Sequence, residues 1–144
     1  MNATAPTTTV SRPGVVTFIG VVIFIQALID AVTAVVTWSR MSDALWLAGA
    51  GFADKDAALW NGILHAAFAV ILFVLWAKLR AGGRGARGLI TFVWAIRLIV
   101  GVGMMVWYPF AEARFHHGVA AVLIGWWVIW ALNSNDKAQD FFGD

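Results

Sequence analysis

The apolar residues of this chain fall into four long blocks separated by short polar stretches. The blocks run over residues 15–37, 59–79, 89–107 and 113–132. Each is close to the length of about 20 helical residues that crosses a hydrocarbon core. A water-soluble helical bundle would instead show charges every three or four positions on its outer face. The pattern therefore predicts an all-α protein, a bundle of four transmembrane helices.

The first block has one alternative interpretation. Residues Val32-Thr33-Ala34 would satisfy the small-residue rule of a signal-peptide cleavage site. A signal peptide, however, combines a positively charged start with an uninterrupted apolar core. Here a single basic residue, Arg12, precedes the block and Asp30 lies inside it. We therefore expect a retained span.

The composition supports a membrane protein, and the sequence excludes several kinds of functional site. Apolar residues make up 61% of the 144 residues and charged residues only 12%, with a mean hydropathy of +0.80, which lies outside the range of soluble domains. The absence of cysteine excludes disulfides and thiolate metal sites. No phosphate-binding glycine loop or HExxH motif is present. The expected partners are thus the lipid bilayer and other membrane chains, with no nucleic acid.

The basic residues of the short links predict the orientation. The link between the second and third blocks holds four basic residues and no acid: Lys78, Arg80, Arg84 and Arg87. Basic links are retained on the cytoplasmic side, and four spans then place both termini in the cytoplasm. The formal charge of +2 follows from this topology and from contact with anionic headgroups. The expected location is the cell membrane.

The segments outside the spans are short. Residues 1–13 are rich in Thr and Pro and are expected to be a disordered cytoplasmic tail. Residues 14–132 form the predicted membrane domain, and residues 133–144 form a polar cytoplasmic tail whose Phe141 and Phe142 would lie on the membrane or against a partner. In the outer loop, residues 44–48 fit a short interfacial helix.

Polar side chains inside the spans are the candidate functional residues, because they are costly in lipid and face the bundle interior. They are Gln26, Asp30, Asn61, His65, Arg97 and His117. A rise of 1.5 Å per residue places Asp30, His65 and His117 at similar depths, and the long Arg97 side chain could reach that layer. The sequence therefore predicts one buried polar cluster that draws on all four spans.

This cluster has a structural and several functional interpretations. In the structural one, Asp30 pairs with Arg97 and the other groups hydrogen-bond across helices, because no water is available to them. In the functional ones, the cluster forms a pocket for a ligand such as a quinone head group, or a proton path in a small transporter that uses Asp30 and Arg97.

The two histidines raise the question of a cofactor. His65 and His117 lie on different spans at matched depth and could ligate a b-type haem. The main expectation is that the chain binds no cofactor, and haem b or a quinone is the alternative. No other bound metal ion is expected, since the neighbouring residues His116 and His117 lack the spacing of zinc ligands.

Several short motifs resemble a family of small four-span integral membrane proteins of unknown function from actinobacteria. The motifs are Arg12-Pro13-Gly14-Val15-Val16-Thr17-Phe18, Leu59-Trp60-Asn61-Gly62-Ile63-Leu64-His65, Gly85-Ala86-Arg87-Gly88, Tyr108-Pro109 and Val128-Ile129-Trp130-Ala131-Leu132. The resemblance implies a retained first span and a histidine near the outer end of the second, which matches His65. Residues 112–117 depart from the family pattern, so that a site with two histidines would be peculiar to this chain, which argues against the haem hypothesis. The resemblance implies a fold and a cell-envelope location, and no chemistry.

These observations favour a non-enzymatic multi-pass membrane protein. Packing residues such as Gly101, Gly118 and Gly125 are abundant, whereas no positioned nucleophile or acid–base pair is evident. We therefore expect an accessory or scaffold subunit of a membrane complex, or a homo-oligomer. A redox or ligand-binding subunit and a small transporter are the alternatives.

Overall fold

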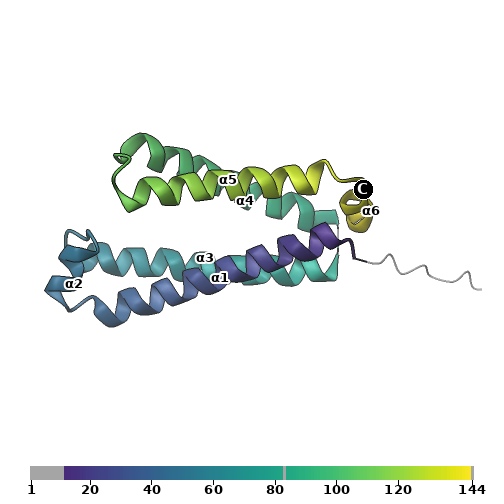
Figure 1. Ribbon diagram of the computed structural model, residues 1–144. Helices are drawn as coiled ribbons and strands as arrows, with labels where there is room; N and C mark the ends of the chain where they lie inside the picture. The colour runs from purple at the N-terminus through teal and green to yellow at the C-terminus, as the bar shows by residue number, and fades with distance from the viewer. Residues whose placement is uncertain (1–11, 83, 144) are drawn as a thin grey trace, which may run out of the picture. The chain divides into compact units, whose positions relative to one another are not determined.

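Four long apolar helices dominate the protein. The computed structural model describes residues 12–82 and 84–143. Its long helices are α1 (Gly14–Arg40), α3 (Lys55–Ala81), α4 (Arg84–Trp107) and α5 (Ala113–Asn133) (Figure 1). All four are long and apolar enough to cross a membrane. This confirms the prediction of an all-α protein with four membrane-length helices. Most of the predicted disordered tail, residues 1–11, lies outside the described residues.

The long helices extend beyond the apolar blocks that predicted them. Helix α1 continues through Ser39 to Arg40, and α3 begins at Lys55, before the apolar run starts. The apolar pattern marks only the part of a helix that lies in hydrocarbon, while backbone hydrogen bonding continues into the interface. Between these helices lies α2 (Ala44–Gly49), which confirms the helix predicted for residues 44–48. Its N-cap Asp43 accepts hydrogen bonds from the backbone N–H groups of Leu45 and Trp46.

The chain divides into two compact units, which we describe separately. One unit comprises Ile19–Ala81 and contains most of α1 together with α2 and α3; we call it the α1–α3 unit. The other comprises the chain up to Phe18 together with Gly82–Asp144; we call it the α4–α5 unit. The second unit is therefore built from both ends of the chain.

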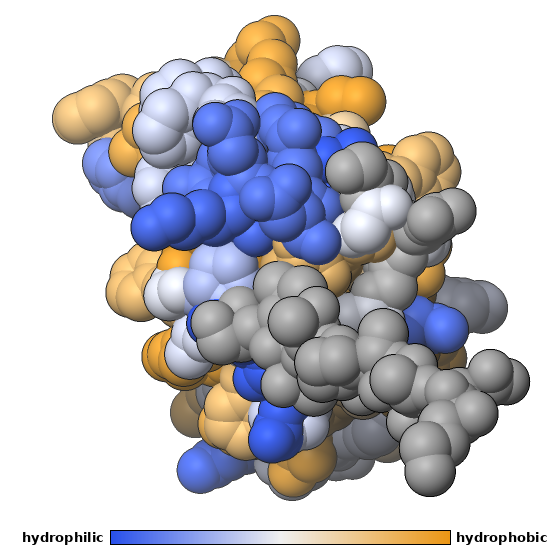
Figure 2. All heavy atoms as spheres, turned by 90° about the vertical axis from the view of Figure 1, so that its right-hand side faces the viewer, coloured by the Kyte–Doolittle hydropathy of each residue, from blue (hydrophilic) through white to orange (hydrophobic). Residues whose placement is uncertain are grey.

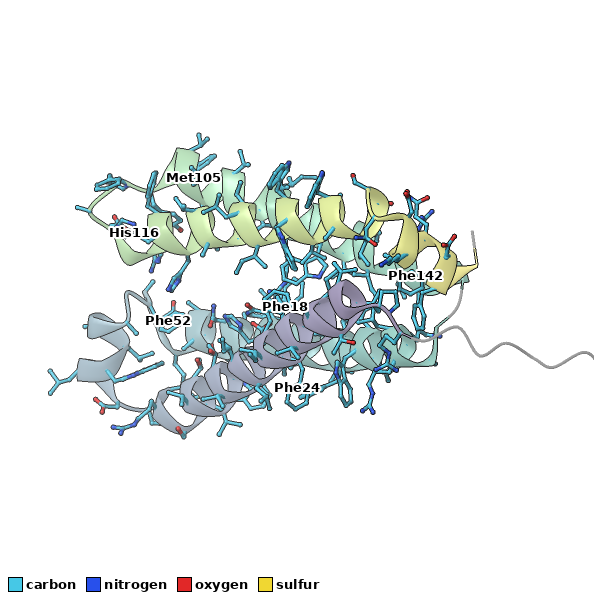
Figure 3. All side chains as sticks on the ribbon, turned by 45° about the vertical axis from the view of Figure 1, so that its right-hand side comes forward. Phe18, Phe24, Phe52, Met105, His116 and Phe142 are labelled. Carbon is cyan, nitrogen blue, oxygen red and sulfur yellow. The ribbon has the colours of Figure 1, made fainter. Side chains whose placement is uncertain are left out.

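In the α1–α3 unit the two long helices run antiparallel. Gly20 of α1 faces Leu79 of α3, and the Phe24 ring packs at 5.1 Å from the Trp76 ring, measured between ring centroids (Figure 3 labels Phe24). Near the other end of α1, the Trp38 side chain lies over Gly62. Residue numbers thus rise along α1 as they fall along α3, as expected for helices joined by one short loop.

In the α4–α5 unit two glycines bring the helix backbones together. A Cβ atom added to Gly118 would lie 2.6 Å from the carbonyl oxygen of Gly101, and one added to Gly101 would lie 2.8 Å from the carbonyl oxygen of Gly118. Only residues without a side chain allow such an approach. The first turn of α1 also belongs to this unit, where the rings of Phe18 and Trp127 meet edge to face with centroids 5.2 Å apart.

The polar C-terminal segment forms a further helix, α6 (Asp136–Phe142), which the sequence did not predict. The Asn135 side chain caps its first turn by accepting from the N–H of Ala138, and Gly143 ends it with a positive φ of 72°. Ala138 and Phe142 are buried, and Phe142 is labelled in Figure 3. Hydrophilic residues gather at this end of the unit in Figure 2. The segment thus packs in part on its own chain.

Gly82, which follows the last residue of α3, has a backbone conformation and a contact with α6 that both favour glycine. Its φ of 66° lies in the left-handed region, which a residue with a Cβ enters at a cost of about 1–2 kcal/mol. A Cβ on Gly82 would also lie 3.2 Å from the Phe141 ring of α6. Glycine therefore serves both the turn into α4 and the contact with α6.

Candidate functional site

The α1–α3 unit contains a buried polar contact between its two membrane-length helices. His65 Nδ1 of α3 lies 2.8 Å from Oδ1 of Asp30 on α1. The Asp30 side chain is 3% exposed and the His65 side chain 33% exposed. Asp30 is therefore the enclosed member of the pair, and the imidazole is the member accessible from outside the unit.

The helical register explains why these two residues meet. The buried residues Ala27, Asp30, Ala34 and Thr37 repeat along α1 at intervals of three or four and form the stripe that packs on α3. Asp30 lies ten residues before the end of α1, and His65 lies ten residues after the start of α3. Antiparallel helices joined at these ends bring both residues to one depth, about 15 Å along each helix.

The side chains of Asp30 and His65 determine which atoms donate and accept in this contact. With Asp30 ionised, its carboxylate can only accept, and Nδ1 of His65 is then the donor of this hydrogen bond. The Gln26 amide, one turn from Asp30, lies 3.5 Å from Oδ2 at the long limit of a hydrogen bond. Hydrogen bonding to a carboxylate fixes the imidazole ring and leaves Nε2 on its opposite edge. Nε2 is thus the ring nitrogen of His65 that does not face Asp30.

Asn61 lies four positions before His65 and therefore on the same face of α3. Its side chain is half-buried. Within the described residues it makes no side-chain hydrogen bond, and His65 makes none beyond its contact with Asp30. Two polar groups one turn apart are therefore available for interaction on this side of the unit.

Arg97 lies in the α4–α5 unit, half-buried on α4. Its guanidinium carbon lies 5.6 Å from the centroid of the Trp94 ring, within range of a cation–π contact. The two residues lie three positions apart and so share one face of α4. Trp94 is 1% exposed, and its indole N–H is the buried polar side-chain group without a hydrogen-bond partner in the described part of the chain.

The two histidines of α5 are both exposed. The ring of His116 contacts Phe110 and Phe115 with centroids 5.1 and 5.7 Å away, and Figure 3 labels it. Burial thus does not single out His117, the candidate residue, from its neighbour His116.

The predicted cluster is brought together in part. Gln26, Asp30, His65 and Asn61 gather within the α1–α3 unit, whereas Arg97 and His117 belong to the α4–α5 unit. A meeting of all six groups, and a haem held by His65 and His117, therefore remain predictions. Within residues 12–82 and 84–143, no group of three or more His, Asp or Glu side chains is placed to hold a metal ion.

The α4–α5 unit has a small recess that the site prediction did not include. It measures about 90 Å³ and is lined by Val15, Trp127, Trp130, Ala131, Ser134 and Asn135. Ligand pockets usually enclose about 300–1,000 Å³, so the recess is too small for a haem. Trp130 also stacks on Trp126, with centroids 6.2 Å apart. The spacing of these tryptophans was the available signal in the sequence.

Comparisons of the chain with protein-family models, with curated proteins and with solved structures found no match.

Proposed function

We propose that this chain is a non-enzymatic component of the cell membrane, an accessory or scaffold subunit that packs against other membrane proteins or further copies of itself. The observation that supports this proposal is the uncovered face of α4. Only 17% of the residues in the apolar window of this span are buried, fewer than in the other three spans. The helix therefore has the most surface left for contacts outside the chain.

The composition of that face favours a protein over lipid alone. Gly88, Phe92, Ile99 and Gly103 lie on one side of α4 by their spacing. Phe92 and Ile99 are 62% and 68% exposed. Gly88 and Gly103 have open space where a Cβ would be. Small residues beside large apolar ones let another helix approach closely, whereas contact with lipid does not require glycine.

Cross-linking from this face tests the proposal. A photoreactive amino acid at Ile99 should yield protein adducts of discrete mass in cells, and the further substitution Gly103→Leu should abolish them, because a large side chain blocks helix approach. The same amino acid at Leu123 of α5, which is 62% exposed, serves as the control. Lipid adducts alone at both positions, with a monomer in mild detergent, would contradict the subunit role.

The proposed orientation places both termini and the Arg-rich link in the cytoplasm, which the excess of Lys and Arg in that link supports. The chain has no cysteine, so Ser42→Cys and Gly85→Cys each introduce one unambiguous label site. A membrane-impermeant maleimide should label residue 42 on intact cells and residue 85 only after permeabilisation. The opposite pattern would reverse the topology.

A further inference from the structure

The small recess of the α4–α5 unit lies where two candidate membrane spans end. Val15, which lines it, is the second residue of the span Gly14–Arg40. Three further lining residues fall in the last two turns of the span Arg114–Asn133, and they are Trp127, Trp130 and Ala131. Tryptophan is typical of the level at which a helix leaves the hydrocarbon. The recess therefore lies at the border between the hydrocarbon and the head groups.

The polarity of the lining changes along the recess. Val15 and Ala131 are apolar, whereas Ser134 and Asn135, which follow the α5 span, contribute a hydroxyl and an amide. The Ser134 hydroxyl makes no hydrogen bond within the described residues. Asn135 accepts from the N–H of Ala138 with its amide oxygen, which leaves its N–H groups as donors. The recess is thus apolar toward the span and offers hydrogen-bond donors at its interfacial end.

The size of the recess favours a narrow occupant. Its volume of about 90 Å³, divided by the roughly 30 Å³ that a water molecule takes up in the liquid, leaves room for about three such groups. A methylene group is of similar size, so a short stretch of hydrocarbon chain fits, whereas a helix does not. Cavities with apolar linings stay dry and take up apolar molecules. Trp130 is 54% exposed, so the recess is accessible from outside the unit along this side chain.

From this geometry we infer that the recess binds one phospholipid of the leaflet at this end of the spans. The first methylene groups of an acyl chain lie between Val15 and Ala131, against the two tryptophan rings. The ester carbonyl oxygen of that chain accepts a hydrogen bond from the Ser134 hydroxyl, beside the Asn135 amide. An ester joins a hydrocarbon chain directly to the polar glycerol, which matches the change in polarity along the recess. This binding role does not depend on the proposed subunit role.

Native mass spectrometry of the full chain in mild detergent tests the inference. Titration with dioleoyl phosphatidylglycerol should reveal one phospholipid per chain that saturates, above weaker adducts that do not. Ala131→Leu fills the recess and Trp130→Ala removes one side of it. Each should weaken binding by at least about tenfold, because the methylene groups lose their burial. The matched control Trp107→Ala, at a tryptophan of α4 that is 82% exposed, should leave the dissociation constant unchanged.

The polar end of the recess has a test of its own. An ether-linked phosphatidylglycerol has no ester carbonyl and should bind the wild-type chain about fivefold more weakly, the usual scale for one hydrogen bond. In Ser134→Ala this difference between the ester and ether lipids should disappear. Equal affinity of the wild-type chain for both lipids would overturn the inference.

The remaining outcomes separate lipid from other occupants. Should Ala131→Leu fail to fold, Trp130→Ala still decides, because that side chain is half exposed. Absence of a saturable phospholipid would overturn the inference, as would equal loss in Trp107→Ala. A photoreactive amino acid at Ser134 that captures a membrane-protein chain in place of a phospholipid would overturn it in favour of a partner's side chain. None of these results alters the cross-linking test at Ile99.

Discussion

Replacing Gly118 with leucine is expected to separate α4 from α5. The added Cβ would lie 2.6 Å from the Gly101 carbonyl oxygen and 3.0 Å from the Met104 Cβ atom. Both of these atoms are fixed by helix geometry, so the helices themselves must move apart. We expect a loss of about 3 kcal/mol in the free energy of unfolding, at the upper end of overpacking costs. Gly118→Ala should produce a smaller loss in the same direction.

The measurement is unfolding by sodium dodecyl sulfate in mild detergent, followed by circular dichroism. Gly85→Leu is the matched control, because it adds the same side chain to α4 where no atom lies within 4 Å of the new Cβ. It should leave the unfolding transition within about 0.5 kcal/mol of wild type. Equal destabilisation by both substitutions would show that leucine itself, and not the contact between the helices, is responsible.

Replacing His65 with leucine is expected to destabilise the α1–α3 unit by about 2 kcal/mol, the usual scale for hydrogen bonds to a charged group. The loss arises because Asp30, which is 2% exposed, loses the donor that lies 2.8 Å from its carboxylate. Asp30→Leu should cost less, since His65 is partly exposed and can find another partner. The more damaging change is thus the one that leaves the buried carboxylate behind.

A double-mutant cycle in the same unfolding assay measures this coupling. The variant that carries both Asp30→Leu and His65→Leu should be more stable than the sum of the single effects predicts, with a coupling energy of about 1–2 kcal/mol. His116→Leu, at an exposed histidine that lies far along the chain, should show no coupling with Asp30→Leu. Additive losses for Asp30 and His65 would mean that their contact contributes nothing to stability.

The sequence predicted the long helices well because lipid imposes a simple rule on them. A helix that crosses hydrocarbon needs about 20 predominantly apolar residues, and the four blocks meet this requirement. Helix α6 was not predicted, because its seven residues include four polar side chains and show little hydrophobic periodicity. Short helices are held mainly by tertiary packing, in this case by Ala138 and Phe142.

The sequence predicts how deep the candidate residues lie in the membrane, but not which of them contact one another. Counting residues placed Asp30 and His65 in one layer, and the structure joins them directly. The pairing of Asp30 with Arg97 stays a prediction, because these two residues belong to separate units. Which face of α3 turns toward α1 depends on packing between Trp38 and Gly62 and between Gly20 and Leu79. Those contacts are formed in three dimensions and leave no periodic signal.

The α4–α5 unit combines segments that lie far apart in the sequence, and this affects when its contacts can form during synthesis. Phe18 of α1 packs on Trp127 of α5, although α3 and α4 lie between them in the sequence. Their contact cannot form before α5 has been synthesised, whereas α1 and α3 are both complete before α4 begins. We therefore expect α1 and α3 to pair first, and the α4–α5 unit to be completed only once α5 has been made.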